Sequence, residues 1–212
     1  MKVCILSDFF IPDLQGGGER RYFELSRRLA KKGWEVDVLC MRVQGRPDEE
    51  KIDGVNVIRL GPRIKKPPKR TPLDFLRYVS SSLYWLMRHE YSIIDANSYI
   101  PFIPAFLGGL LTNTPVVATV HDVYGREWSG RYNPTVAGML EFILVNIPFK
   151  RIITVSRSTR DILTSRYRVP SNRIKVIPTG VDLDYIDSVK AGPRKNNSLL
   201  YVGRLIRHKH LE

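Results

Sequence analysis

The feature that most constrains this chain is the regular alternation of short apolar runs with helix-length segments. Each run has the length of a buried strand, and the intervening segments carry apolar residues at helical spacing. Such alternation indicates parallel strands joined by helices that cover both faces of a sheet. We therefore predict an α/β fold with a Rossmann-like, doubly wound parallel sheet. The predicted strands are Lys2–Ser7, Glu35–Met41, Asp53–Leu60, Ser92–Asp95, Pro115–Val120, Arg151–Ser156 and Arg173–Pro178. The predicted helices are Glu19–Lys32, Leu73–His89, Pro101–Leu111, Thr135–Ile147 and Ser158–Tyr167.

The alternation breaks near the end of the chain. Residues Asp187–Ser198 are polar, contain Gly and Pro, and lack apolar periodicity, as a linker does. After them, Leu199–Val202 has the pattern of a new first strand. We therefore predict a first domain over residues 1–186, a linker over 187–198 and the start of a second domain over 199–212. Because a strand with nothing after it cannot bury its faces, we expect a fragment that ends just past a domain boundary.

The lengths of the apolar runs and the positions of the cysteines indicate the cellular compartment of the protein. No apolar run is long enough to span a bilayer, and Asp8, Pro12 and Asp13 interrupt the N-terminal apolar stretch too early for a signal peptide. Cys4 and Cys40 each lie in a predicted strand among apolar neighbours. This placement favours small core side chains in a reducing compartment over a disulfide or metal site. We therefore predict a cytoplasmic protein.

The net charge of +13 indicates an anionic partner. Nucleic acid, anionic lipid and a phosphorylated substrate are the candidates. The excess is concentrated in "RLGPRIKKPPKR", Arg59–Arg70, which holds six basic residues and no acidic one. Its prolines predict an exposed, extended loop over Gly61–Thr71. No aromatic residue is interleaved with these cations for base stacking, so nucleic acid is not the predicted partner.

Two interpretations of this basic segment remain open. The loop and the following helix, which carries Tyr84 and Trp85, suit a peripheral contact with an acidic membrane surface, which would bring a lipid acceptor within reach. The alternative is a solvated loop followed by an ordinary helix that faces the core.

Three consecutive glycines, Gly16, Gly17 and Gly18, lie between the first predicted strand and its helix. Ligands of parallel α/β sheets bind beyond the carboxyl ends of the strands. Glycine lets the backbone approach a ligand closely, and a helix N-terminus favours a phosphate. The glycines therefore predict a phosphate site, with a merely flexible turn as the alternative. The spacing fits neither a dinucleotide fingerprint nor a Walker A loop.

His121 and Asp122 follow the predicted strand Pro115–Val120, at the same edge of the sheet. This position makes His121 a candidate functional residue, although a core histidine or a helix cap would also fit. No pair of histidines has the spacing of metal ligands, so no metal site is predicted.

Four motifs, in this order and spacing, give the chain its resemblance to a known family. They are "PDLQGGGE" (Pro12–Glu19), "VVATVHD" (Val116–Asp122), "VIPTGVD" (Val176–Asp182) and "YVGRLIRHK" (Tyr201–Lys209). Together they resemble the retaining glycosyltransferases of family 4, which have the two-domain GT-B fold. The segment "ITVSRSTRDIL", Ile153–Leu163, also fits the family. The resemblance covers the whole chain and makes it the N-terminal half of such a fold, followed by the start of the nucleotide-sugar-binding domain.

The resemblance implies transfer of a sugar from a nucleotide-diphosphate sugar to an acceptor, with retention of configuration and without a metal or other cofactor. It places the amides of Gly16–Gly18 against the donor phosphate and His121 against the donor sugar as the catalytic residue. Arg204 and Lys209 would neutralise the diphosphate leaving group. Further candidate residues of the cleft are Glu19, Asp122, Thr179 and Gly180. The acceptor, lipid-linked or glycan, is not identified.

The sequence departs from the family pattern in two places. Thr179 replaces the more common asparagine, although its hydroxyl still offers a hydrogen bond. The acidic motif of the second domain, a pair of glutamates, does not occur in the chain. We therefore expect the 212-residue chain to be inactive alone. A nucleotide-sugar epimerase, a phosphorylase-like GT-B enzyme, and a basic membrane- or nucleic-acid-binding module remain as alternative functions.

Overall fold

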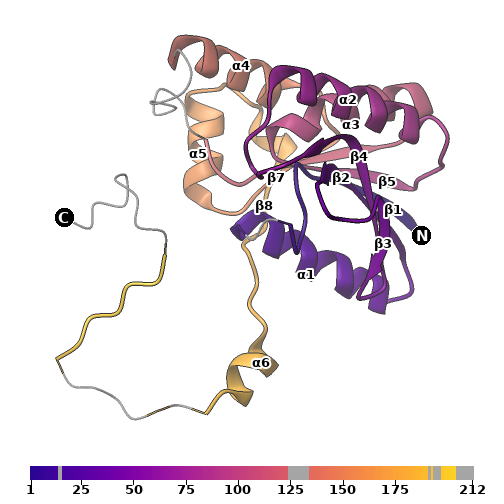
Figure 1. The fold of residues 1–212 in the computed structure, drawn as a ribbon. Coiled ribbons are helices and arrows are strands. Elements are labelled where there is room, and N and C mark those ends of the chain that lie inside the picture. The colour runs from indigo at the N-terminus through magenta and orange to yellow at the C-terminus, as the bar shows by residue number, and fades with distance from the viewer. Residues whose placement is uncertain (14–15, 124–133, 191, 193–196, 204–212) are drawn as a thin grey trace. The chain divides into compact units, whose positions relative to one another are not determined.

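The computed structural model describes residues 1–13, 16–123, 134–190, 192 and 197–203. It divides into two compact units, Met1–Thr179 and Gly180–Glu212. Figure 1 shows the helices and strands of both units. The domain boundaries drawn from the sequence stay predictions.

The first unit is built on one eight-stranded sheet with the order β3-β4-β2-β1-β5-β6-β7-β8. Every neighbouring pair is parallel except the edge pair of β3 and β4. The α/β class and the doubly wound parallel sheet are thereby confirmed. The strands are β1 (Lys2–Leu6), β2 (Glu35–Val43), β3 (Glu49–Ile52), β4 (Val55–Ile64), β5 (Ile93–Asn97), β6 (Val116–Val120), β7 (Arg151–Thr154) and β8 (Ile174–Val176).

Helices cover both faces of this sheet. In Figure 1, α1 lies on one side, and α2, α3 and α4 lie on the other. The buried side chains divide accordingly into one cluster that includes α1 and a larger one that includes α2 to α5. The helices of this unit are α1 (Gly17–Lys31), α2 (Pro72–Leu86), α3 (Tyr99–Thr112), α4 (Pro134–Asn146) and α5 (Arg157–Ser165), with a 3-10 turn at Ser171–Arg173.

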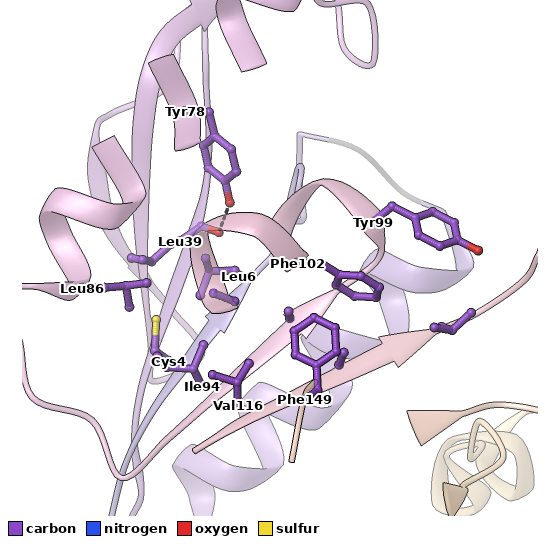
Figure 2. Packing of buried hydrophobic residues seen from close by; sticks show 14 of the residues in the cluster. Cys4, Leu6, Leu39, Tyr78, Leu86, Ile94, Tyr99, Phe102, Val116 and Phe149 are labelled. Atoms are coloured by element: carbon purple, nitrogen blue, oxygen red, sulfur yellow. Dashed lines mark hydrogen bonds between the residues drawn. The ribbon is translucent and has the colours of Figure 1, made fainter. Parts of the chain in front are cut away.

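The larger cluster packs aromatic rings against aliphatic strand residues. Figure 2 shows Phe102 of α3 beside Phe149, whose ring centroids lie 5.1 Å apart in an edge-to-face arrangement. The Tyr78 hydroxyl of α2 donates to the carbonyl of Leu39, so the helix is tied to β2 by a polar bond as well (Figure 2). Cys4 is a buried free thiol of this cluster, and Cys40 is buried in the other cluster as predicted.

The edge of the sheet at β3 corrects the sequence prediction. The predicted strand Asp53–Leu60 is the second arm of a hairpin whose first arm, β3, the sequence did not indicate. Asp53 and Gly54 form the turn, both with positive φ. β4 continues through Gly61 to Ile64, so the first part of the predicted basic loop is strand. Pro62 is tolerated there because β3 pairs with β4 only over Val55–Ile58, and the register between β2 and β4 shifts at the position of Pro62.

The second unit contains the helix α6 (Leu183–Ser188), which begins with a hydrogen bond from the Tyr185 amide to the Asp182 side chain. The predicted strand Leu199–Val202 is wrong: these residues are exposed and form no strand. A strand requires a neighbouring strand for its backbone groups, and the strand pairs of the described residues do not include this segment.

Among the described residues, no helix is both long and apolar enough to cross a bilayer.

Candidate functional site

Polar side chains at the ends of three strands lie close together at the carboxyl edge of the sheet. Ser7 follows β1, Asn97 ends β5 and His121 follows β6. The Ser7 hydroxyl donates to the carbonyl of Phe9 at 2.8 Å, and the Asn97 amide nitrogen donates to the Ser7 hydroxyl at 2.9 Å. The Asn97 amide oxygen lies 2.7 Å from Nε2 of His121. The chain of bonds thus runs from buried backbone to the imidazole.

This chain of bonds fixes the proton on the imidazole ring. Because the Ser7 hydroxyl gives its proton to Phe9, it accepts from Asn97, and the NH₂ end of the Asn97 amide must face it. The amide oxygen therefore faces His121, where it accepts a proton from Nε2. In the neutral ring Nδ1 is then the acceptor.

The surroundings of His121 keep its ring neutral. Burial, reinforced by the positive charge of Arg21, lowers the pKa of the imidazole to about 4. The Tyr22 ring lies edge-on to the imidazole, with 6.1 Å between the ring centroids. Near neutral pH the site therefore presents a hydrogen-bonding imidazole of defined tautomer rather than a cation.

The start of α1 reaches this histidine. A Cβ added to Gly18 would lie 3.4 Å from Nε2 of His121, so the ring lies beside Gly18 and leaves little room for a side chain there. The first intrahelical bond runs from the Arg20 amide to the Gly16 carbonyl, and the amides before it have no partner within the helix. The Glu19 carboxylate accepts from the Gly16 amide at 3.0 Å, which leaves the amides of Gly17 and Gly18 for an anion.

Arg21 brings a positive charge to the same edge. Its guanidinium donates to the carbonyl of Ile177 at 3.2 Å and to the hydroxyl of Thr179 at 3.3 Å. These contacts place Thr179, a sequence-predicted residue of the cleft, beside the first turns of α1. No local sequence signal distinguishes Arg21 from the other basic residues of that helix.

A buried polar contact holds α1 against the sheet beneath the site. The Tyr22 hydroxyl lies 2.8 Å from a carboxylate oxygen of Asp95 on β5 and 2.6 Å from the hydroxyl of Thr119 on β6. Burial raises the pKa of the Asp95 carboxyl to about 6, against the opposing effect of the Tyr22 hydrogen bond. The helix that carries the glycines is therefore fixed to the two strands that carry Asn97 and precede His121.

The loop before the glycines is anchored by a buried ion pair. Nε of Arg59, on β4, donates to the Asp13 carboxylate at 2.8 Å, and both side chains are fully buried. Arg59 also lies 2.5 Å from Glu50 on β3, and Asp13 is paired with Arg46 at 2.8 Å. The hairpin that the sequence analysis missed therefore helps to position the glycine loop.

The other residues predicted for the cleft are Asp122, Gly180, Arg204 and Lys209, and the structure places only some of them. The exposed Asp122 caps the amide of Val123 with its side chain, and its carbonyl oxygen lies 2.7 Å from the Tyr99 hydroxyl. Gly180 is the first residue of the second unit and is not placed relative to this site. Arg204 and Lys209 lie outside the described residues.

These features define a class of protein: a Rossmann-like domain whose first helix, rich in glycine at its start, faces a neutral histidine at the carboxyl edge of the sheet. Residues 15–185 match the family Glycosyltransferase Family 4. The chain belongs to this family, as an N-terminal domain of the GT-B type.

Known proteins resemble the chain along almost its entire length. An uncharacterized glycosyltransferase of Methanocaldococcus jannaschii is 26% identical over 230 residues, which cover 100% of this chain and 57% of that protein. Sucrose-phosphate synthase of Thermosynechococcus elongatus superposes with a TM-score of 0.72 at 18% identity, over 86% of this chain and 49% of that one. The crystal structure of Anabaena HepE in complex with UDP-glucose superposes with a TM-score of 0.59 at 17% identity, over 87% of this chain and 45% of that one. The chain thus spans about half the length of these proteins.

Proposed function

We propose that the whole protein transfers a sugar from a nucleotide-diphosphate sugar to an acceptor. The observation that carries this proposal is the position of Gly18 beside His121 at the N-terminus of α1, with Arg21 one turn further on. Amides and a cation at such a position suit the diphosphate of an activated sugar, and the imidazole lies beside them. Membership of the family and the UDP-glucose complex of HepE support a nucleotide-sugar donor.

In the proposed reaction, charge that develops on the diphosphate leaving group is stabilised by the amides of Gly17 and Gly18 and by cations. Arg21 supplies one cation, and the sequence predicts two more, Arg204 and Lys209. These cations would stabilise the charge on the diphosphate, as a metal ion does in metal-dependent enzymes. We therefore propose a metal-independent reaction. Nδ1 of His121 would accept a hydrogen bond from a sugar hydroxyl, and the sugar would keep its anomeric configuration.

The test is an assay of the full gene product with UDP-, GDP- and ADP-sugars, with and without a lipid extract and a glycan mixture as acceptors. We expect acceptor-dependent release of a nucleoside diphosphate. Gly18→Val should lower kcat/KM by about 100-fold, because its side chain displaces the imidazole or the donor.

The matched control is Gly138→Val, since a Cβ at Gly138 meets no atom within 4 Å. This variant should retain the parent activity within about twofold, as surface changes away from a site usually do. Equal losses in the two variants would remove the basis for placing the donor at α1. Conversion of the donor into its epimer without any acceptor would instead establish the epimerase alternative.

We also propose a peripheral contact with the cytoplasmic face of an anionic membrane. Lys65, Lys66 and Lys69 are exposed in the loop between β4 and α2. At about 1 kcal/mol per lysine, neutralising all three to Gln should lower binding to vesicles of phosphatidylglycerol and phosphatidylcholine by about 100-fold at low salt. Sedimentation measures this binding.

The control for the vesicle experiment replaces three exposed lysines with Gln: Lys31 at the end of α1, Lys32 directly after it and Lys51 on β3. This variant has the same net charge as the first but keeps the loop intact. An equal loss of binding in the two variants would show a dependence on overall charge alone and would contradict a membrane-facing loop.

A further inference from the structure

An apolar pocket of about 260 Å³ opens between α2, α3 and α4, on the side of the sheet opposite α1. Phe75 of α2, Ile100 and Ile103 of α3, and Val136, Leu140 and Leu144 of α4 supply most of its wall. None of these side chains carries a polar atom. A pocket so lined suits a hydrocarbon rather than a sugar or nucleotide, because a polar ligand would lose its hydration without gaining hydrogen bonds.

The polar groups at the pocket are already paired with one another. The Tyr99 hydroxyl donates to the buried Glu141 carboxylate at 2.6 Å, and the Tyr167 hydroxyl donates to the same carboxylate. The Glu141 charge is thereby directed toward two hydroxyl groups rather than into the pocket. The apolar character of the wall is thus maintained although two of its residues, Tyr99 and Glu141, are polar.

The pocket lies close to the candidate active site. Tyr99, which lines it, also has its hydroxyl 2.7 Å from the carbonyl of Asp122, the residue after His121. A ligand in the pocket could therefore extend past Tyr99 toward the imidazole. This adjacency is expected for the binding site of an acceptor, which must reach the donor sugar.

The basic loop directly precedes α2, the helix that supplies one side of the pocket. α2 begins with the Thr71 cap directly after the loop, and Phe75 lies one helical turn into it. The exposed lysines Lys65, Lys66 and Lys69 therefore precede the pocket wall by a few residues, which favours an anionic group near the apolar chain.

Further exposed apolar side chains lie on two of the helices that form the pocket, α2 and α4. Examples are Leu73 and Leu76 on α2, and Phe142 and Ile143 on α4. Clusters of this kind on a protein surface mark sites that bind proteins, membranes or apolar ligands. Here the adjoining lysines favour an anionic amphiphile.

We propose that this pocket binds the hydrocarbon chain of an amphiphilic acceptor whose anionic head group faces Lys65, Lys66 and Lys69. The occupant is an alkyl or prenyl chain on a phosphate or similar head. The assignment as an acceptor rests on the proposed sugar transfer, whereas binding of the chain in the pocket does not.

The experiment is calorimetric titration of the full gene product with hexyl, octyl and decyl phosphate, each below its micellar concentration, and with inorganic phosphate. Affinity should rise by about fourfold per added methylene if the chain enters the pocket. Leu140→Gln should weaken binding of decyl phosphate by about tenfold, since it places an amide in the pocket wall. Affinity independent of chain length would overturn the proposal.

Met139→Gln is the matched control. Met139 is the neighbour of Leu140 on α4, is similarly exposed (65% against 54%) and does not line the pocket. Its variant should bind decyl phosphate like the parent protein. Equal weakening in the two variants would place the alkyl chain on the open surface and overturn the proposal.

A full gene product that binds no alkyl phosphate would also overturn the proposal, because another part of the protein would then cover the pocket. Chain-length-dependent binding without sugar transfer to any lipid would leave the pocket assigned and refute the proposed function at this site.

Discussion

Replacement of Arg59 with methionine is expected to lower the free energy of unfolding by about 3 kcal/mol, near the lower limit for breaking a buried ion pair. The substitution leaves the fully buried Asp13 carboxylate without the guanidinium that lies 2.8 Å from it. Arg46 still reaches Asp13 from the surface, which keeps the loss from being larger. Urea denaturation of the 212-residue chain, followed by tryptophan fluorescence, measures the change.

The control is Arg63→Met, on the same strand. Arg63 is 55% exposed and pairs with Asp48 at 2.9 Å, so its removal should change the free energy of unfolding by less than about 1 kcal/mol. The difference between the two variants isolates the effect of burial. A loss below about 1 kcal/mol for Arg59→Met would contradict the view that this pair anchors the loop before the glycines.

Replacement of Asn97 with leucine is expected to release the imidazole of His121 from its single tautomer. The parent ring should show the Nε2–H form in long-range ¹H–¹⁵N correlation spectra, with a titration midpoint of about 4. Without the amide oxygen, Nε2–H loses its acceptor, and the two neutral tautomers should both become populated. In the full gene product, kcat should fall by about 10- to 100-fold, because loss of a hydrogen-bond partner at a buried group costs about 1–3 kcal/mol.

The conservative variant Asn97→Asp separates positioning from packing. A carboxylate still accepts from Nε2–H, so the tautomer should persist, while the added negative charge should raise the pKa of His121 above its parent value. At pH 8 the His121 ring is neutral in the parent protein and in both variants. At this pH, Asn97→Asp should recover most of the kcat that Asn97→Leu loses. A parent spectrum with mixed tautomers, or equal activity of the two variants at that pH, would contradict a positioning role for Asn97.

The missed hairpin strand shows where the sequence pattern lacked information. The segment "EEKI" of β3 has three charged residues and no apolar alternation. Edge strands tolerate such residues because one of their sides faces solvent and a neighbour supplies the backbone hydrogen bonds. Only its antiparallel pairing with β4 defines it as a strand.

In the candidate site, too, residues with a local sequence signal were predicted and those without one were not. The sequence indicated Gly18 and His121, since glycines before a helix and a polar residue after a buried strand both carry local signals. Asn97 lay beyond the predicted end of its strand, Ser92–Asp95, whereas β5 continues to Asn97. Arg21 had no local signal, because its partner Thr179 is 158 residues away along the chain.

The sequence by itself determined the α/β class, the order of nearly all strands and helices along the chain, and the edge of the sheet at which to seek a site. Periodicity and turn residues are local properties, so they can be read without coordinates. Only the tertiary structure decided that Asn97 bonds His121, that Asp13 pairs with Arg59, and that α2, α3 and α4 enclose an apolar pocket. Each of these depends on distances between segments far apart in sequence, which the packing of the sheet and helices establishes.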